Sequence, residues 1–413
     1  MDQSTIQSLA LIATAAVLAP VIADLLRRFR IPSVVIEIGL GILIGQQALG
    51  WAEVGDVVKG LSELGLAFLM FLAGFEIDLQ RIKGSPLVKA CLGWLLSLAI
   101  AFSLALFLVS TGFALNSLVI GLVLTTTALG TLLPMLRDAD ILTTPFGGFM
   151  LAIGTVGEFG PIVAIAILLT GDNPLGTGVL LVVFVAVAVV AALLAVRPQP
   201  PKLVALLRKN LHSSTQLPVR VSVLLIIVLV WLASELGLDV LLGAFAAGVV
   251  VRLLSHGEDG EVVRVKLEAI GFGFLVPIFF IVSGMQFDVD ALLSSPTTLL
   301  RLPLFLLLFL VVRGVPALLL YRRSLPHDQL PPLAFLSATG LPLIVVITGI
   351  GVDTGRMLPE NAAALVGAGM LSVLIYPLIG FAQLRRAGVI PEDSSLYVSD
   401  DIDAPDPPDP LDP

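Results

Sequence analysis

Long apolar stretches separated by short polar loops run along the chain from residue 5 to residue 382. A helix that crosses a membrane needs about 20 mostly apolar residues. Thirteen stretches meet this requirement, and they predict an all-α polytopic membrane protein with about thirteen transmembrane helices. The predicted spans are 5–26, 33–50, 59–78, 86–111, 115–136, 146–170, 175–196, 219–235, 237–254, 266–288, 298–321, 331–353 and 361–382.

Basic residues fall almost entirely in alternate loops between these spans. One set of loops holds 19 Lys and Arg residues, the opposite set holds 3, and Arg313 lies inside a span. Because cytoplasmic loops are enriched in Lys and Arg, we expect the N-terminus outside and the C-terminus in the cytoplasm. The localisation that we predict is the plasma (inner) membrane.

Two short motifs recur at the same distance along the chain. Residues 74–78 match residues 284–288, and residues 127–130 match residues 337–340, both at an offset of 210. The common offset indicates six spans, one linking span and six further spans. Equivalent spans are then seven apart, and because seven is an odd number the second set crosses the membrane in the inverted orientation. Inverted repeats are typical of secondary transporters, whose substrate site lies where the repeats meet. Chance similarity between apolar helices is the alternative interpretation.

Composition and charge narrow the possible classes of protein. The chain is 57% hydrophobic and 13% charged, whereas about a quarter of the residues in soluble proteins are charged. This difference excludes a soluble enzyme, a nucleic-acid binder and a disordered protein. The net charge of −8 arises in residues 387–413, which hold eight acids and no Lys or Arg. We expect that segment to be a disordered, acidic, Pro-rich cytoplasmic tail. The single cysteine, Cys91, excludes an internal disulfide, and we expect it to be buried in a helix.

Two ionisable side chains, Glu158 and Arg313, lie in the middle of predicted spans. A charge at that depth costs about 2.5–3.5 kcal/mol on insertion scales, so each is a candidate functional residue. A buried carboxylate can hold either a proton or a small cation. We therefore predict Glu158 as the proton-binding group and as a transient ligand of Na⁺ or K⁺, with Arg313 as its charge partner. The alternative is an ion pair between the two side chains that is structural only.

Small polar residues beside Gly and Pro mark the middle of the fifth and twelfth spans. Such positions predict interrupted helices whose broken ends present carbonyls and hydroxyls to an ion, although single hydroxyls often only bond neighbouring helices. At the end of the third span, Glu76 and Asp78 have either a gating or a structural role. The polar residues that we expect to line the ion site are Thr126, Thr127, Ser337 and Thr339.

At these residues the chain resembles the sodium/proton exchanger superfamily, and within it the second cation:proton antiporter family, which includes glutathione-gated potassium efflux systems. Residues 71–78 are similar to that family's signature in the third span, and residues 32–38 to the beginning of its second span. Residues 126–128 resemble the first crossing helix, and residues 277–284 the end of the tenth span. The resemblance runs over nearly all of residues 5–382.

The resemblance implies a homodimer in which a core domain moves against a scaffold. Glu158 falls where the family carries its ion-binding aspartate, and Arg313 where it carries a Lys or Arg. The chain departs from the family at Gly157, where an acid or amide is usual, and at Leu341, where an acid is usual. The expected division is a transmembrane domain 1–386, with scaffold helices 5–78 and 219–288, core helices 86–170 and 298–382 and a linking helix 175–196, followed by the tail 387–413.

The function that these features predict is a secondary antiporter that exchanges Na⁺ or K⁺ for protons by alternating access. No Gly-rich phosphate loop follows a strand, so ATP-driven pumping has no support. We expect neither an enzyme nor a cofactor, and no nucleic-acid partner. A separate cytoplasmic regulatory subunit is a possible partner. Two alternatives stay open, namely a non-transporting sensor or channel-like subunit on the same fold, and a sodium-coupled organic anion symporter.

Overall fold

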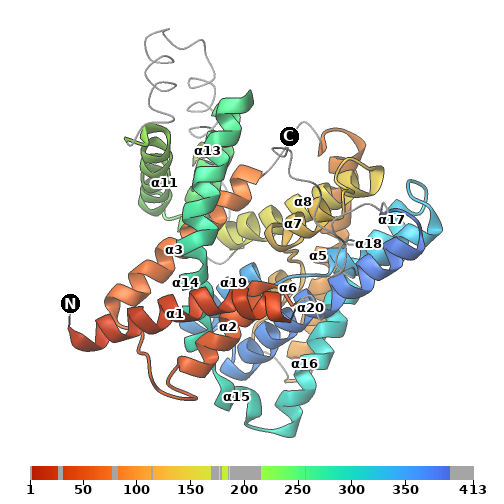
Figure 1. Cartoon of the computed structure of the whole chain (residues 1–413). Helices are drawn as coiled ribbons and strands as arrows, with labels where there is room; N and C mark the ends of the chain where they lie inside the picture. Colours follow the sequence, from red (N-terminus) through yellow and green to blue (C-terminus); the bar gives the residue numbers. More distant parts are fainter. Residues whose placement is uncertain are drawn as a thin grey trace, which may run out of the picture.

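The computed structural model of the chain describes residues 2–26, 31–76, 82–112, 115–168, 215–255 and 257–390, with short stretches between 176 and 186. Within these residues the regular elements are helices (Figure 1). They are α1 (Gln3–Leu25), α2 (Ser33–Ile44), α3 (Asp56–Glu76), α5 (Ser85–Ser110), α6 (Ser117–Leu124), α7 (Leu129–Asp138), α8 (Pro145–Leu168), α11 (Leu217–Glu235), α12 (Val240–Leu254), α13 (Gly257–Ile270), η2 (Gly271–Leu275), α14 (Val276–Met285), α15 (Val289–Leu293), α16 (Pro296–Phe309), η3 (Leu310–Gly314), α17 (Val315–Tyr321), η4 (His327–Gln329), α18 (Leu330–Ser337), α19 (Pro342–Asp353) and α20 (Pro359–Arg386).

Apart from the seventh, each predicted span overlaps helices of the structure, although α2 ends at Ile44 and not at residue 50. In the described part of the chain nine helices are long and apolar enough to cross a membrane, and three shorter apolar helices accompany them. The all-α polytopic fold is therefore confirmed. Most of the predicted linking helix 175–196 and residues 391–413 of the predicted tail lie outside the described residues. The expectation for Cys91 was wrong, because this residue lies on α5 with its side chain exposed.

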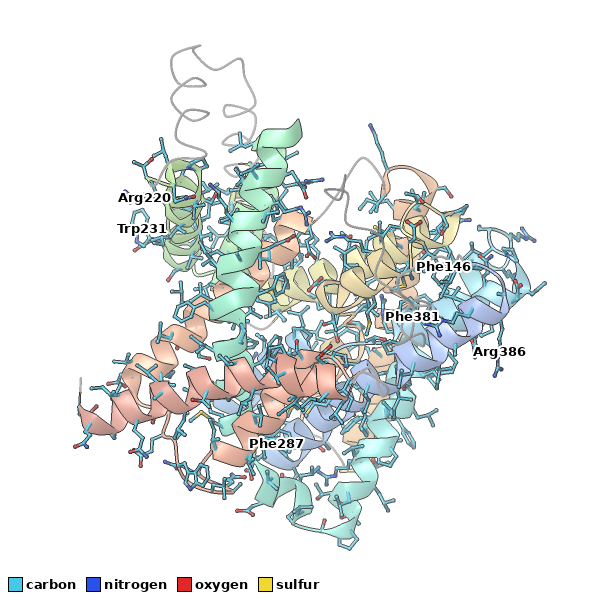
Figure 2. The ribbon with its side chains drawn as sticks, in the orientation of Figure 1. Phe146, Arg220, Trp231, Phe287, Phe381 and Arg386 are labelled. Atoms are coloured by element: carbon cyan, nitrogen blue, oxygen red, sulfur yellow. The ribbon has the colours of Figure 1, made fainter. Side chains whose placement is uncertain are left out.

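The outer surface of the molecule carries large apolar side chains. Trp231 projects from α11 at the edge of the molecule and is 62% exposed (Figure 2). Val17 and Leu25 on α1 are 66% and 78% exposed. A soluble protein buries such side chains, whereas the hydrocarbon of a bilayer solvates them, so these faces are suited to contact lipid or another membrane helix.

In the described part of the chain several pairs of helices approach each other so closely that only glycine fits between them, and two of these pairs resemble each other. A Cβ atom at Gly248 of α12 would lie 2.0 Å from the Phe71 carbonyl oxygen of α3, and one at Gly74 of α3 would lie 2.1 Å from the Phe245 carbonyl oxygen of α12. The pair α2 and α14 repeats this arrangement, because a Cβ atom at Gly284 would lie 2.2 Å from a carbonyl oxygen of α2. Gly74 and Gly284 are the glycines of the first recurring motif.

We expect Gly248→Ala to destabilise the folded protein by about 1–3 kcal/mol, because the added methyl group forces α3 and α12 apart. Gly60→Ala on α3 is the matched control, since nothing lies within 4 Å of its Cβ position. The measurement is the thermal unfolding midpoint of each purified variant in detergent. Equal midpoints for the two variants would contradict the close packing of these helices.

Among the described residues two helices contain a widened π turn, and the sequence explains both. The π segments η2 and η3 each end immediately before a Val-Pro pair, at Pro277 and Pro316. Proline has no amide hydrogen and its ring clashes with the carbonyl four residues earlier, so the preceding turn opens. The η3 segment includes Arg313, and the widened turn therefore contributes to where this side chain points.

Candidate functional site

The two discontinuous helices that the sequence predicts are present, and their breaks contact each other. One break separates α6 from α7, and the other separates α18 from α19. The Ala128 amide nitrogen donates to the Thr339 carbonyl oxygen at 2.8 Å. The Thr127 hydroxyl donates to the Ser337 carbonyl oxygen at 2.6 Å, which joins two residues that are 210 apart. At this crossing, each broken helix thus forms hydrogen bonds with backbone groups that the break in the other helix leaves unpaired.

Helix α8 joins the crossing at Gly157. The Thr127 amide nitrogen donates to the Gly157 carbonyl oxygen at 3.0 Å. In an unbroken helix this carbonyl would bond the amide of the fourth following residue, which here is Pro161 and has no amide hydrogen. The proline therefore leaves an acceptor free for the crossing, one residue before Glu158.

Glu158 is buried against the beginning of α7. Its side chain is 5% exposed, and the backbone amides of Leu129 and Gly130 are hydrogen-bond donors to its carboxyl group. These two residues are the first of α7. The partial positive charge at a helix N-terminus favours a carboxylate there.

Arg313 lies on another side of the crossing. It is 4% exposed, and its Nε donates to the Thr127 hydroxyl at 2.9 Å. Its Nη1 donates to the Ser97 hydroxyl at 3.3 Å, and its Nη2 to the Ile153 carbonyl oxygen at 3.3 Å. Because α6 and α18 end at the crossing, Arg313 lies beside the negative ends of two helices.

The expected direct pairing of Arg313 with Glu158 is not formed in this conformation. Both side chains belong to the described part of the chain, and no ion pair there joins them. Each buried charge instead contacts groups of the crossing that complement it. The structural ion pair between the two residues is therefore not what holds them in place.

The predicted polar residues all lie at the crossing, but three of them turn their hydroxyls to their own helices. Thr126 donates to the Val123 carbonyl at 2.9 Å, Thr339 to that of Phe335 at 3.3 Å, and Ser337 to that of Ala334 at 2.9 Å. Ser337 also lies 3.3 Å from the Arg313 carbonyl oxygen. Of the four, Thr127 alone contacts the Arg313 guanidinium through its side chain in the described structure.

The sequence interpretation missed Ser372 of α20. Its hydroxyl lies 3.1 Å from the Gly340 amide nitrogen and 2.9 Å from the Gly340 carbonyl oxygen. It therefore satisfies the backbone of the second break next to Leu341, where the family resemblance leads one to expect an acid. Its signal in the sequence was only a single hydroxyl in an apolar span, which is common in membrane helices.

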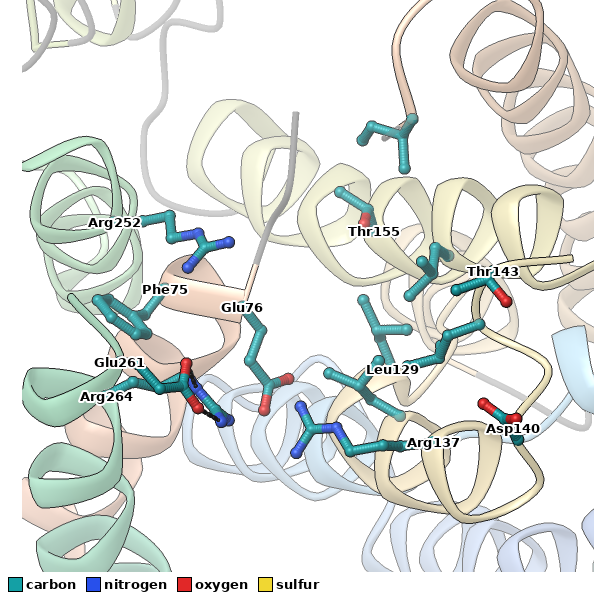
Figure 3. Close-up of a pocket in the computed structure, with 14 residues that line it drawn as sticks. Phe75, Glu76, Leu129, Arg137, Asp140, Thr143, Thr155, Arg252, Glu261 and Arg264 are labelled. Carbon is teal, nitrogen blue, oxygen red and sulfur yellow. Dashed lines mark hydrogen bonds and ion pairs between the residues drawn. The ribbon is translucent and has the colours of Figure 1, made fainter. Parts of the chain in front are cut away.

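A cavity of about 380 Å³ opens between α3, α7, α8, α12 and α13 (Figure 3). Its wall carries Glu76, Asp140 and Glu261 together with Arg137, Arg252 and Arg264. Leu129 and Thr155 also line it. The Leu129 amide contacts the Glu158 carboxyl, and Thr155 precedes Glu158 by less than one helical turn. Glu158 therefore lies directly behind the part of the cavity wall that these two residues form.

Glu76 and Arg137 face each other across this cavity (Figure 3). One carboxyl oxygen of Glu76 is buried and has no hydrogen-bond partner among the described residues. Arg264 of α13 is held by Glu261 and by Glu268, the latter at 2.6 Å. Asp78, the other acid predicted here, lies outside the described residues.

Several known proteins with similar sequences are named as Na⁺/H⁺ antiporters or as a potassium-efflux protein. The chain is 29% identical to the putative Na⁺/H⁺ antiporter YjbQ of Bacillus subtilis over 95% of its own length and 65% of that protein. It is 23% identical to the probable Na⁺/H⁺ antiporter 3 of Methanocaldococcus jannaschii, over 87% of this chain and 92% of the relative. It is 28% identical to the glutathione-regulated potassium-efflux protein KefC of Escherichia coli, over 92% of this chain and 60% of KefC. The chain thus spans less than two thirds of the length of two of these relatives.

The fold is also that of a solved transporter. The sodium proton antiporter MjNhaP1 of Methanocaldococcus jannaschii superposes with a TM-score of 0.64 at 16% identity, over 95% of this chain and 100% of MjNhaP1. The model of the transmembrane sodium/hydrogen exchanger family matches residues 12–386. Together with the broken helices that cross beside a buried carboxylate, this match shows that the chain is a multi-pass membrane protein that belongs to the sodium/hydrogen exchanger family.

Proposed function

We propose that the chain is a secondary antiporter that exchanges Na⁺ or K⁺ for protons. The observation that carries this proposal is the Glu158 carboxyl, which is buried at the crossing and lies behind the inner wall of a polar cavity. A carboxyl in that place binds either a proton or one monovalent cation. The exclusion of one by the other couples the two fluxes.

For a cation or a proton bound at Glu158 to pass from one side of the membrane to the other, the crossing must move. We propose that α5–α8 and α16–α20 form a core that carries Glu158, and that α1–α3 and α11–α14 form the scaffold and the homodimer contact. The cavity lies between these two groups, because α7 and α8 line one side and α3, α12 and α13 line the other. If the core moved so that this cavity closed and another cavity opened on the opposite side of the membrane, Glu158 would face the two sides in turn.

The experiment that tests the proposed function is flux measurement in proteoliposomes. An outward or inward gradient of Na⁺ or K⁺ should drive proton movement that a pH-sensitive dye reports, and a pH gradient should drive uptake of the cation. Cation flux without obligatory proton flux would indicate a channel. Neither flux would indicate a sensor, and sodium-dependent uptake of an organic anion would indicate a symporter.

We further propose that Glu76 and Arg137 form a gate at the mouth of the cavity. Glu76 ends α3 of the scaffold and Arg137 lies on α7 of the core. Figure 3 shows the two side chains pointing toward each other. When the cavity closes, the pair would come together and hold the core against the scaffold.

For this gate, Arg137→Ala should slow exchange about two- to fivefold, the effect of a partly exposed ion pair worth up to about 1 kcal/mol. The double exchange Glu76→Arg with Arg137→Glu should recover part of the loss, because it restores opposite charges across the cavity. Arg323→Ala, at an exposed position outside the cavity lining, is the control and should exchange normally. If the double variant exchanges more slowly than Glu76→Arg alone and Arg137→Glu alone, the gate is contradicted.

A further inference from the structure

A second, very small cavity lies behind the Arg313 guanidinium, between α5, α8 and α17. We propose that one buried water molecule binds there and joins Arg313 to Tyr321 and Trp94, and that Tyr321 thereby positions Arg313 at the crossing. The role in transport rests on the proposed antiport through Glu158. The water site itself does not, since it follows from the cavity and the polar atoms around it.

The size of the cavity fits one water molecule. Its volume is about 10 Å³, and a site needs about 10–15 Å³ of such space to hold one water. Trp94, Ser97, Arg313 and Tyr321 give the cavity polar groups, and the remaining lining is apolar or backbone. A water molecule requires two to four polar partners in such a place, and this lining can supply them.

Two of these polar groups have no hydrogen-bond partner among the described residues. They are the Tyr321 hydroxyl and the Trp94 indole nitrogen, both of which are buried. The Tyr321 side chain is 1% exposed. An unsatisfied buried polar group costs about 1–3 kcal/mol, so a water that accepts from the indole and pairs with the hydroxyl removes a substantial penalty.

Arg313 can provide the third partner. A guanidinium has five N–H donors, and three of them are used by Thr127, Ser97 and the Ile153 carbonyl. Two N–H donors of the guanidinium are left over, and Arg313 lines the cavity. Tyr321 follows Arg313 by eight residues and ends α17, and both side chains line the cavity.

The rings around the site are held in place by their own packing. The Tyr321 ring meets Phe149 edge to face, with 5.1 Å between centroids. A Cβ atom at Gly160 would lie 2.5 Å from the Trp94 ring, so the glycine allows the indole to lie directly on α8, two residues beyond Glu158. This packing holds both rings in place beside the cavity that they line, and an ordered water requires such fixed partners.

The consequence for exchange follows from the chain of contacts. The water ties Tyr321 to the guanidinium, the guanidinium bonds the Thr127 hydroxyl, and Thr127 bonds the Ser337 carbonyl of the other broken helix. Without the Tyr321 hydroxyl the guanidinium can turn toward Glu158. Its positive charge then competes with the cation for that carboxylate, so the apparent KM for the cation rises while the maximal rate changes little.

Transport by Tyr321→Phe tests the positioning role. The apparent KM for Na⁺ or K⁺ should rise about three- to tenfold, the effect of one lost hydrogen bond, with a maximal rate within about twofold of wild type. Trp94→Phe keeps a ring on Gly160 and should shift KM in the same direction. Tyr376→Phe is the matched control, because this buried tyrosine bonds the Leu306 carbonyl and is not part of the cavity. A KM shift in the control as large as in Tyr321→Phe, or none in Tyr321→Phe, overturns the role.

The water is tested separately by X-ray radiolytic labelling in H₂¹⁸O, which oxidises buried side chains beside bound water. Tyr321 and Trp94 should be labelled in the wild-type protein, whereas Tyr376 should not. Labelling of Tyr321 that is no stronger than that of Tyr376 overturns the water site. If the sites are labelled while Glu158→Gln still exchanges ions, the proposed function fails and the water site stands.

Discussion

Proteoliposomes that contain Glu158→Gln are expected to show no cation-dependent proton movement above that of protein-free liposomes. Glutamine keeps the size of the side chain and can accept the hydrogen bonds from the Leu129 and Gly130 amides. The glutamine amide neither takes up a proton near neutral pH nor balances the charge of a bound cation. Because both fluxes use this one group, the loss should be complete and should not be relieved by raising the cation concentration.

Two companion variants separate this result from a folding defect. Glu158→Asp keeps the carboxyl group and should retain exchange at a reduced rate, since the shorter side chain reaches the first turn of α7 less well. Glu63→Gln removes a carboxylate from an exposed position of α3 and should leave exchange unchanged. All three variants should elute from a sizing column like the wild type. Normal exchange by correctly inserted Glu158→Gln would refute the assignment.

Hydrophobic patterning in the sequence was sufficient to predict the helices. Apolar length alone locates a membrane span, and span ends such as those at Pro145 and Pro296 coincide with prolines. The breaks in the fifth and twelfth spans were also predictable, because Thr, Ser and Gly gather there without helix-stabilising neighbours. The same sequence reasoning selected Glu158 as the candidate ion-binding residue, because a carboxylate at that depth has few explanations other than function, and in the structure this residue is buried beside the crossing.

Side-chain directions could not be predicted in the same way. The sequence interpretation paired Arg313 with Glu158, whereas the guanidinium bonds Thr127, Ser97 and the Ile153 carbonyl. The π turn at Leu310–Gly314 changes the rotation of the helix at Arg313, and ordinary helical periodicity does not include such a turn. The Val-Pro pair after the turn was a usable signal. Pro161 was another, because it frees the Gly157 carbonyl that the crossing binds.

The resemblance leads one to expect an acid or an amide at position 157, and the structure gives a physical reason for the glycine that stands there. A Cβ atom at this position would lie 2.5 Å from Arg313 Nη2, 2.7 Å from the Thr127 hydroxyl oxygen and 2.8 Å from the Thr127 Cβ atom. The space that a side chain would need is therefore occupied by the guanidinium and by the crossing itself. The absence of a side chain at Gly157 leaves the space that the Arg313 guanidinium fills. The guanidinium thus lies against the helix that carries Glu158 without forming an ion pair with that residue.

Gly157→Ala is accordingly expected to lower the exchange rate at least about tenfold, even though it adds only one methyl group. The guanidinium could turn aside, but Thr127 Cβ is attached to the backbone, so the crossing must shift to make room. A displacement on the order of 1 Å in a binding site can cost about a hundredfold in rate. The measurement is initial proton movement after a cation step in proteoliposomes.

The matched control for this prediction is Gly148→Ala on the same helix, where nothing lies within 4 Å of the Cβ position. Alanine favours a helix over glycine by up to about 1 kcal/mol, so this variant should exchange normally and unfold at the same or a higher temperature. Gly157→Ala combined with Thr127→Ser removes the methyl group of the threonine but leaves its Cβ, so it should recover little. Full activity of Gly157→Ala would mean that the crossing yields without loss of function, and the glycine would then not be required by Arg313.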